Sequence, residues 1–265
     1  MKITVFTSNQ PRHLALIESL AEVADVIYAV QECNTVFPGQ VNDFFKKSEV
    51  MQKYFQHVLA AEKEVFGKVR FLPENVRQVA IKSGDLNKLE TSILAPSLQS
   101  DCYVVFGSSF IKEPLIGFLV GKKAYNIHMG VSPKYRGNSC NFWALYDGRP
   151  EYVGATIHLL TQGLDSGPIL FHALPKSESV DGFVLGMKAV QAAHTGLIKF
   201  IQNGFKTEFS PVTQDKSLEL RYTRNTDFTD QIASEYLLSK LHSAADIKSA
   251  LEKRDMNEFI RPFLG

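Results

Sequence analysis

Four side chains able to exchange protons or hydrogen bonds lie close together in this 265-residue chain: Asn126, His128, His158 and Asp165. An amide can donate a hydrogen bond to a developing oxyanion. An imidazole can move protons or stabilise charge, and a carboxylate can orient the imidazole and relay a proton through water. Together these groups suit direct acyl transfer to a neutral nucleophile. The sequence has no G-x-S-x-G nucleophile motif, which agrees with transfer that acylates no residue.

Predicted strands and turns explain how these groups could meet. Asn126 and His128 lie in the apolar segment "KKAYNIHMG", and residues two apart on a strand point to the same face. In an open α/β sheet, ligands bind outside the carboxyl ends of the strands. Asp165 lies in the turn "QGLDSG", from which a carboxylate can project into a cleft. Structural interpretations stay open, because a strand histidine is often a packing residue and an aspartate in such a turn often forms an Asx-turn.

Apolar periodicity predicts an α/β fold. Residues 2–7, 12–23 and 24–32 have the patterns of strand, helix and strand, as in a parallel βαβ unit with a right-handed crossover. Further strands are expected at 67–73, 101–109, 122–130, 153–161 and 167–175, the last two as a pair. Asp181 should begin a long helix that Gly204 ends. The tail should hold a strand at 217–224 and helices at 227–242 and 244–260.

The segment 37–75 has a charged, helical pattern with one broad apolar face, and we interpret it as a helical insertion between strands. Phe44, Phe45 and Tyr54 belong to that face. We expect a surface helix that packs on the sheet, peripheral to the chemistry. A lid or a dimer contact is the alternative.

Composition limits the class of protein. A hydrophobic content of 45% and a charged content of 22% are typical of a globular chain with a sizeable core. A net charge of +1 creates no global field for nucleic acid or membrane. No apolar run approaches the roughly 20 residues that span a bilayer. The N-terminus lacks a signal peptide's pattern, so a cytoplasmic location is expected. Three cysteines without C-x-x-C spacing indicate neither a disulfide framework nor a zinc site.

The order of the motifs resembles the folate-dependent formyltransferase family, which includes sugar N-formyltransferases, methionyl-tRNA formyltransferase and glycinamide ribonucleotide transformylase. N-x-H is followed by a proline, Y-R-G, W-A, G-A-T-I-H and L-D-S-G, mostly within residues 101–172. The resemblance implies a Rossmann-like, mostly parallel sheet flanked by helices. It also implies N10-formyltetrahydrofolate as donor, no metal, and catalytic roles for Asn126, His128 and Asp165.

Two departures from the family pattern accompany this resemblance. Gly130 and Val131 stand where the family usually has two leucines, and Asn138-Ser139-Cys140 replaces a stretch in which a proline is common. These departures bear on the details of the folate contact, while the catalytic triplet is intact.

The resemblance further implies a pterin pocket built largely from backbone groups, which can imitate the edge of a base pair. The loop "GSSFIK" should form one side, and the turn before Asp165 the other. The implied donor contacts are Ser109, Phe110, Ile111, Lys112, Pro133, Leu160, Gly163 and Leu164. His158 should either support Asp165 or be an ordinary strand residue.

The wording "NFWAL" and "GATIH" resembles the sugar-modifying branch, whose members formylate amino sugars, often nucleotide-linked, for bacterial surface polysaccharide such as lipopolysaccharide O-antigen. The start of the first predicted helix is a candidate anion site, with a plain helix cap as the alternative. The candidate acceptor contacts are Ser8, Asn9, Arg12, His13, Arg136, Trp143, Arg221 and Tyr222. Simple turn chemistry at Arg136 and a core role for Trp143 stay open.

Two units are expected: a Rossmann-like formyltransferase domain over 1–204, with its insertion at about 37–75, and a small strand-plus-helices appendage over 205–265. A short tail and a net charge of +1 count against a tRNA acceptor, since methionyl-tRNA enzymes usually carry a C-terminal β-barrel with a basic face. We therefore expect a small-molecule amine acceptor and no nucleic-acid or membrane partner. A methionyl-tRNA formyltransferase-like enzyme, a formyltetrahydrofolate hydrolase and a homodimer stay open.

Overall fold

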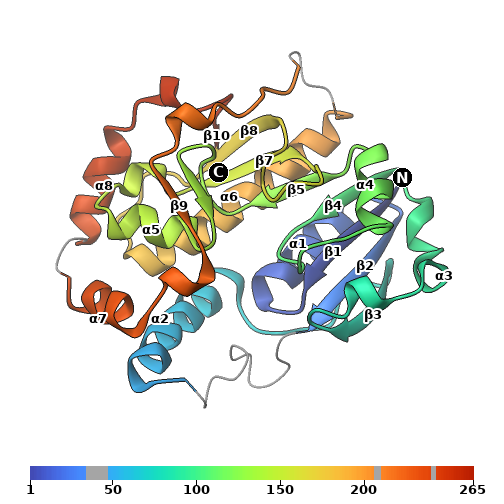
Figure 1. The fold of residues 1–265 in the computed structure, drawn as a ribbon, viewed down its shortest axis with the longest axis horizontal. Helices are drawn as coiled ribbons and strands as arrows, with labels where there is room; N and C mark the ends of the chain where they lie inside the picture. Colours follow the sequence, from blue (N-terminus) through green and yellow to red (C-terminus); the bar gives the residue numbers. More distant parts are fainter. Residues whose placement is uncertain (34–46, 206–209, 240–242) are drawn as a thin grey trace.

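A mixed eight-stranded sheet forms the centre of the computed structural model, which describes residues 1–33, 47–205, 210–239 and 243–265 (Figure 1). The strand order is β10-β8-β7-β5-β4-β1-β2-β3. The strands are β1 Lys2–Ser8, β2 Val26–Cys33, β3 Val76–Lys82, β4 Cys102–Val105, β5 Tyr125–His128, β7 Ala155–Leu159, β8 Ile169–Leu174 and β10 Phe263–Leu264. β1 to β5 are mutually parallel, and β7 runs antiparallel to both β5 and β8.

Helices cover both faces of the sheet, because neighbouring residues on a central strand point to opposite sides. Val5 packs with helices α1 (Pro11–Ala21) and α6 (Gly182–Gln202) on one face. Phe6, the next residue, packs with α4 (Leu115–Gly121) on the other. Asp181 begins α6 as predicted, since its carboxylate accepts hydrogen bonds from two backbone amides of the first turn.

The C-terminal segment is joined to both sheets of the structure. β9 (Arg221–Thr223) pairs in parallel with β6 (Tyr135–Gly137), and β10 pairs with β8 at the edge of the main sheet. The other helices are α2 Glu49–Phe66, α3 Thr91–Leu94, α5 Cys140–Tyr146, α7 Asp230–Leu238 and α8 Ala244–Glu252. The 3-10 helices are Leu86–Lys88, Ser97–Gln99, Pro150–Tyr152, Lys216–Leu218, Asn225–Asp227 and Met256–Glu258. The division at residue 204 stays a prediction.

Most predicted elements are confirmed, with two corrections. The strand predicted at 67–73 is wrong: Phe71 is fully exposed there, and the edge strand β3 lies at 76–82 instead. β3 escaped prediction because its half-exposed pattern contains few apolar residues. The helix predicted at 244–260 ends at Glu252, and Asp255 begins a separate 3-10 turn.

The insertion is only partly described. Helix α2 lies within it and packs against α6 and α7, whereas Phe44 and Phe45 fall outside the described residues. None of the helices within the described ranges is long and apolar enough to cross a membrane.

Candidate active site

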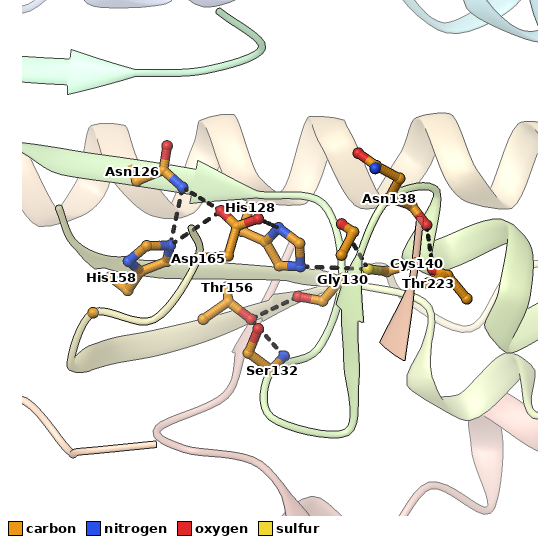
Figure 2. A network of polar contacts seen from close by, with 12 residues as sticks. Asn126, His128, Gly130, Ser132, Asn138, Cys140, Thr156, His158, Asp165 and Thr223 are labelled. Carbon is orange, nitrogen blue, oxygen red and sulfur yellow. Dashed lines mark hydrogen bonds and ion pairs between the residues drawn. The ribbon is translucent and has the colours of Figure 1, made fainter. Parts of the chain in front are cut away.

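Strand β5 and its neighbour β7 bring three of the four polar side chains together (Figure 2). Asn126 and His128 lie two residues apart on β5, as predicted. The antiparallel register places Asn126 directly opposite His158 on β7. Directly opposite residues project to the same face of a sheet, and here the Asn126 Nδ2 atom lies 2.9 Å from His158 Nε2.

Asp165 reaches the same group from the turn after β7. Its Oδ2 lies 3.1 Å from His128 Nδ1, and its Oδ1 lies 3.1 Å from Asn126 Nδ2. The Asp165 backbone is left-handed, with φ of 44°, a region that aspartate and asparagine enter more readily than most residues. Gly167 allows the turn to close, because a Cβ there would lie 1.7 Å from the Leu159 carbonyl oxygen.

Hydrogen bonding fixes the orientation of the Asn126 amide. His158 Nδ1 lies 2.8 Å from the Leu159 carbonyl oxygen, which can only accept, so Nδ1 carries a hydrogen. In the neutral imidazole, His158 Nε2 is then an acceptor for the Asn126 N–H. The second N–H of the amide faces the Asp165 carboxylate. His158 therefore supports the site mainly through Asn126, while its Nε2 is 3.8 Å from Asp165 Oδ1.

The charges of His128 and Asp165 stabilise each other. Burial alone would lower the pKa of His128, but the Asp165 carboxylate and the Cys140 thiol outweigh it, and the pKa lies well above the ordinary value. Burial alone would raise the pKa of Asp165, but His128 and His158 outweigh it and hold that pKa below its usual range. The imidazolium and carboxylate forms are thus favoured near neutral pH.

A central cavity of about 290 Å³ opens beside these residues. Asn126, His128 and Asp165 line it, together with the loop after β4 and the turn after β7. Six of the eight predicted donor contacts line the same cavity: Ser109, Phe110, Ile111, Leu160, Gly163 and Leu164. The other two do not. Lys112 donates its backbone N–H to Asn87, and Pro133 lines a separate surface pocket.

The predicted acceptor residues at the start of α1 divide into two groups. Ser8 and His13 are buried and bonded within the protein: Ser8 Oγ donates to the Glu32 carbonyl, and His13 Nδ1 pairs with the Thr7 hydroxyl. Arg12 lines a second cavity next to the central one, and its Nη1 lies 2.8 Å from Glu62 Oε1. Asn9 is partly buried and lines neither cavity.

The remaining predicted acceptor residues lie around β6 and β9, outside the lining of either cavity. Arg136 pairs with Glu219 at 2.9 Å, and Arg221 pairs with Asp147 at 3.2 Å. Trp143 is buried with the Arg221 guanidinium 4.5 Å from its ring centre. Tyr222 is exposed beside Arg136.

The motif Y-R-G owes its glycine to the pairing of β6 with β9. Gly137 has φ of 90°, and a Cβ there would lie 1.9 Å from the Thr223 carbonyl oxygen. Only glycine allows the C-terminal strand to approach this closely. Gly137 and the two residues after it form one rim of the central cavity.

Three supporting residues were missed by the sequence analysis as site residues. Buried Glu32 accepts hydrogen bonds from the backbone N–H and the hydroxyl of Ser109 at 2.6 and 2.8 Å, which anchors the loop after β4. A carboxylate at the end of an apolar strand was the available signal. Gln214 donates to the carbonyls of Asp165 and Gly167, both at 2.8 Å, and no local pattern marks it. Cys140, in the stretch that departs from the family pattern, contacts His128.

Comparison with known proteins shows the family of this chain. The model of the family described as formyl transferase matches residues 1–177. The chain belongs to the formyl transferase family. It is 28% identical over 196 residues to methionyl-tRNA formyltransferase from Thermotoga maritima, covering 70% of this chain and 57% of that one. It is 30% identical over 122 residues to the Synechococcus enzyme of the same name, and this match covers 46% of this chain and 38% of that one. The matched part of the chain therefore spans less than two thirds of the length of these relatives.

Solved formyltransferases share the fold of this family member. A 4-N formyltransferase from Francisella tularensis aligns with a TM-score of 0.52 and 16% identity over 86% of this chain and 77% of that one. An N-formyltransferase from Helicobacter canadensis, in complex with folinic acid and dTDP-3-aminofucose, aligns with a TM-score of 0.52 and 14% identity over 99% and 83%. Phosphoribosylglycinamide formyltransferase from Anaplasma phagocytophilum aligns with a TM-score of 0.51 and 16% identity over 84% of this chain and 98% of that one. The predicted Rossmann-like fold is confirmed.

Proposed function

We propose that this formyl transferase transfers a formyl group from N10-formyltetrahydrofolate to the amine of a nucleotide-linked amino sugar. The observation that carries the proposal is the contact of Asn126, His128 and Asp165 at the wall of one cavity. The same three residue types, in this arrangement, suit direct acyl transfer.

The central cavity fits a flat ring with a polar edge, as in the pterin of the donor. The backbone N–H and C=O of Ile111 and the carbonyl of Leu160 make no hydrogen bond within the described ranges, so they can pair with such an edge. Phe110 and Leu164 are half exposed at the rim, at 53% and 50%, and offer apolar contact to the rest of the molecule. The bound donor supplies the formyl group.

The three polar residues have distinct tasks in this proposal. Both nitrogens of His128 face partners, so its imidazolium acts on a developing oxyanion through its charge. Asn126 gives up the longer of its two hydrogen bonds, the 3.1 Å bond to Asp165, and donates that N–H to the formyl oxygen instead. That exchange frees Asp165 Oδ1 to accept the proton that the attacking amine loses. The same proton can then pass to N10 of the departing tetrahydrofolate as the bond between N10 and the formyl carbon breaks.

The amino-sugar acceptor is supported by two observations. Structures that align with 95% to 99% of this chain include a formyltransferase in complex with a UDP-linked formamido sugar and tetrahydrofolate, and one with dTDP-3-aminofucose. A net charge of +1 also provides little of the cationic surface on which tRNA binding depends. Action in the cytoplasm, for bacterial surface polysaccharide such as O-antigen, belongs to the same proposal.

The test is a screen of amino sugars, nucleotide-linked amino sugars and methionyl-tRNA with N10-formyltetrahydrofolate. Mass spectrometry reads the gain of one formyl group. Formylation of a nucleotide-linked sugar supports the proposal, and formylation of methionyl-tRNA alone replaces it with the activity named for the sequence relatives. Donor turnover that needs no amine would identify a hydrolase.

A further inference from the structure

A second cavity of about 330 Å³ adjoins the central one. Met129 and Ser139 line both cavities, and Met129 directly follows His128. A ligand that extends from Asn126 past these two residues therefore enters the second cavity. Helices α2, α5, α6 and α7 contribute its walls. The helical insertion, which we expected to be peripheral to the chemistry, therefore lines a cavity next to the candidate site through α2.

Aromatic side chains line most of the second cavity, which we call the aromatic cavity. Its ring-bearing residues are Tyr54, Phe55, Phe142, Phe183, Phe228 and Tyr236. The rings of Phe183 and Phe228 lie 5.3 and 4.9 Å from that of Tyr54, in tilted or edge-on arrangements. Walls of this kind bind a flat heterocycle by stacking and edge contacts.

One polar group in the aromatic cavity lacks a partner. Tyr54 is only 8% exposed, and its hydroxyl makes no hydrogen bond within the part of the chain that the structure describes. Within the described part of the chain this hydroxyl is not one of the fully buried polar atoms without a partner, so it is open to a ligand in the cavity. A ligand with a polar edge would satisfy it, whereas a purely apolar ligand would not.

A glycine keeps the aromatic cavity open. Gly186 lies in the interior of α6 and lines the cavity, and a Cβ there would meet no atom within 4 Å. Glycine inside a helix is less stable than alanine. Packing within the protein therefore does not require glycine at position 186, and the missing side chain leaves space in the cavity.

Positive charge lies beside the aromatic walls. The Lys47 ammonium is 5.0 Å from the centre of the Phe55 ring, and it has no carboxylate partner within the described ranges. The Arg12 guanidinium also lines the cavity, with one of its nitrogens bound to Glu62. Aromatic walls with cations beside them suit a ligand that joins a flat polar ring to phosphate, as a nucleotide does.

We propose that the aromatic cavity binds the nucleobase of the acceptor, with its phosphates toward Lys47 and Arg12 and its amino sugar across Met129 and Ser139. This inference rests on the proposed function. It makes Gly186 and Tyr54 specificity-determining residues, because one leaves room for the base and the other bonds to its edge.

The test is calorimetric titration of the protein with thymidine, uridine and guanosine diphosphates. At least one should bind the wild type. Gly186→Leu should weaken that binding at least tenfold, and Tyr54→Phe about three- to tenfold, as for one lost hydrogen bond. Gly121→Leu is the matched control, because a Cβ at Gly121 would also meet no atom within 4 Å, whereas Gly121 lies on α4, away from the cavity.

Two further measurements distinguish a local effect of Gly186→Leu on nucleotide binding from damage to the fold or to the donor site. Circular dichroism and the affinity for a non-transferring folate analogue should be unchanged in Gly186→Leu. Binding of no nucleoside diphosphate, or equal binding by wild type and Gly186→Leu, overturns the inference. If formyl transfer to a nucleotide-free amine is nevertheless observed, formyl transfer itself survives and only the nucleotide assignment fails.

Discussion

The Sγ atom of Cys140 lies 3.5 Å from Nε2 of His128, while Nδ1 of the same imidazole faces Asp165. The thiol also lies 3.4 Å from the Gly137 carbonyl oxygen, to which it can donate its only hydrogen. All these contacts are satisfied together when His128 carries two protons, because Nε2–H then donates to sulfur. The imidazolium is therefore the form that the arrangement favours.

Replacing Cys140 should change the titration of His128. In Cys140→Ala the Nε2–H loses its partner, so we expect a lower pKa of His128 and a three- to tenfold fall in kcat, as for one weak hydrogen bond. Cys140→Ser should lose less. NMR titration of the histidines and the pH profile of kcat measure both effects. Cys33→Ala is the control, and an unchanged pKa of His128 in Cys140→Ala would contradict the assignment.

Asp165→Asn should abolish most activity and leave donor affinity nearly intact. Asparagine tolerates the left-handed backbone at this position, so the turn should survive. It cannot accept a proton or hold His128 as an imidazolium, and kcat should fall by about 10² to 10⁴. Turnover measured beside calorimetry with a non-transferring folate analogue tests this. With Asp230→Asn as the control, retention of more than about a tenth of kcat would make Asp165 a turn residue.

Gln214→Glu should loosen the turn that carries Asp165. The Gln214 amide donates to two carbonyl oxygens of that turn, and a carboxylate of the same shape cannot donate. We expect roughly a tenfold fall in kcat, in the range of one to two lost hydrogen bonds. Gln202→Glu, on the exposed end of α6, is the matched control. Equal kinetics of the two variants would show that the two hydrogen bonds from Gln214 have no part in catalysis.

Acid should destabilise the fold through two buried histidines. Burial lowers the pKa of His172 to about 4 and that of His194 to about 3. Below the ordinary value of 6.5 the unfolded chain takes up protons that the folded chain does not, so the free energy of unfolding falls as pH decreases from 6.5 toward these values. The loss approaches about 1.4 kcal/mol per pH unit for each imidazole. His128, with its raised pKa, has the opposite sign: its contribution is present below pH 6.5 and is lost as pH rises through its folded pKa.

Urea unfolding at pH 7.5 and pH 5.0 measures this difference. His194→Leu should reduce the pH dependence of the free energy of unfolding, whereas His57→Gln, at an exposed position, should not. A pH dependence that is the same in both variants would show that His194 does not contribute to it.

Local sequence determined the elements whose patterns are short-range. Alternation placed Asn126 and His128 on one face of a strand, and Asp181 marked the start of α6, because strand geometry and helix capping depend on neighbours within a few residues. The family motifs named the candidate catalytic triplet. The edge strand β3 was missed because an exposed edge carries little apolar signal.

Tertiary structure alone decided which distant groups meet. The pairing register of β5 and β7 sets Asn126 beside His158, and the chain return after β8 brings Gln214 to the Asp165 turn. The aromatic cavity joins rings from α2, α5, α6 and α7, whose spacing in sequence carries no mutual pattern. Such contacts depend on how whole elements pack, and packing is set by the summed burial of many residues rather than by any local signal.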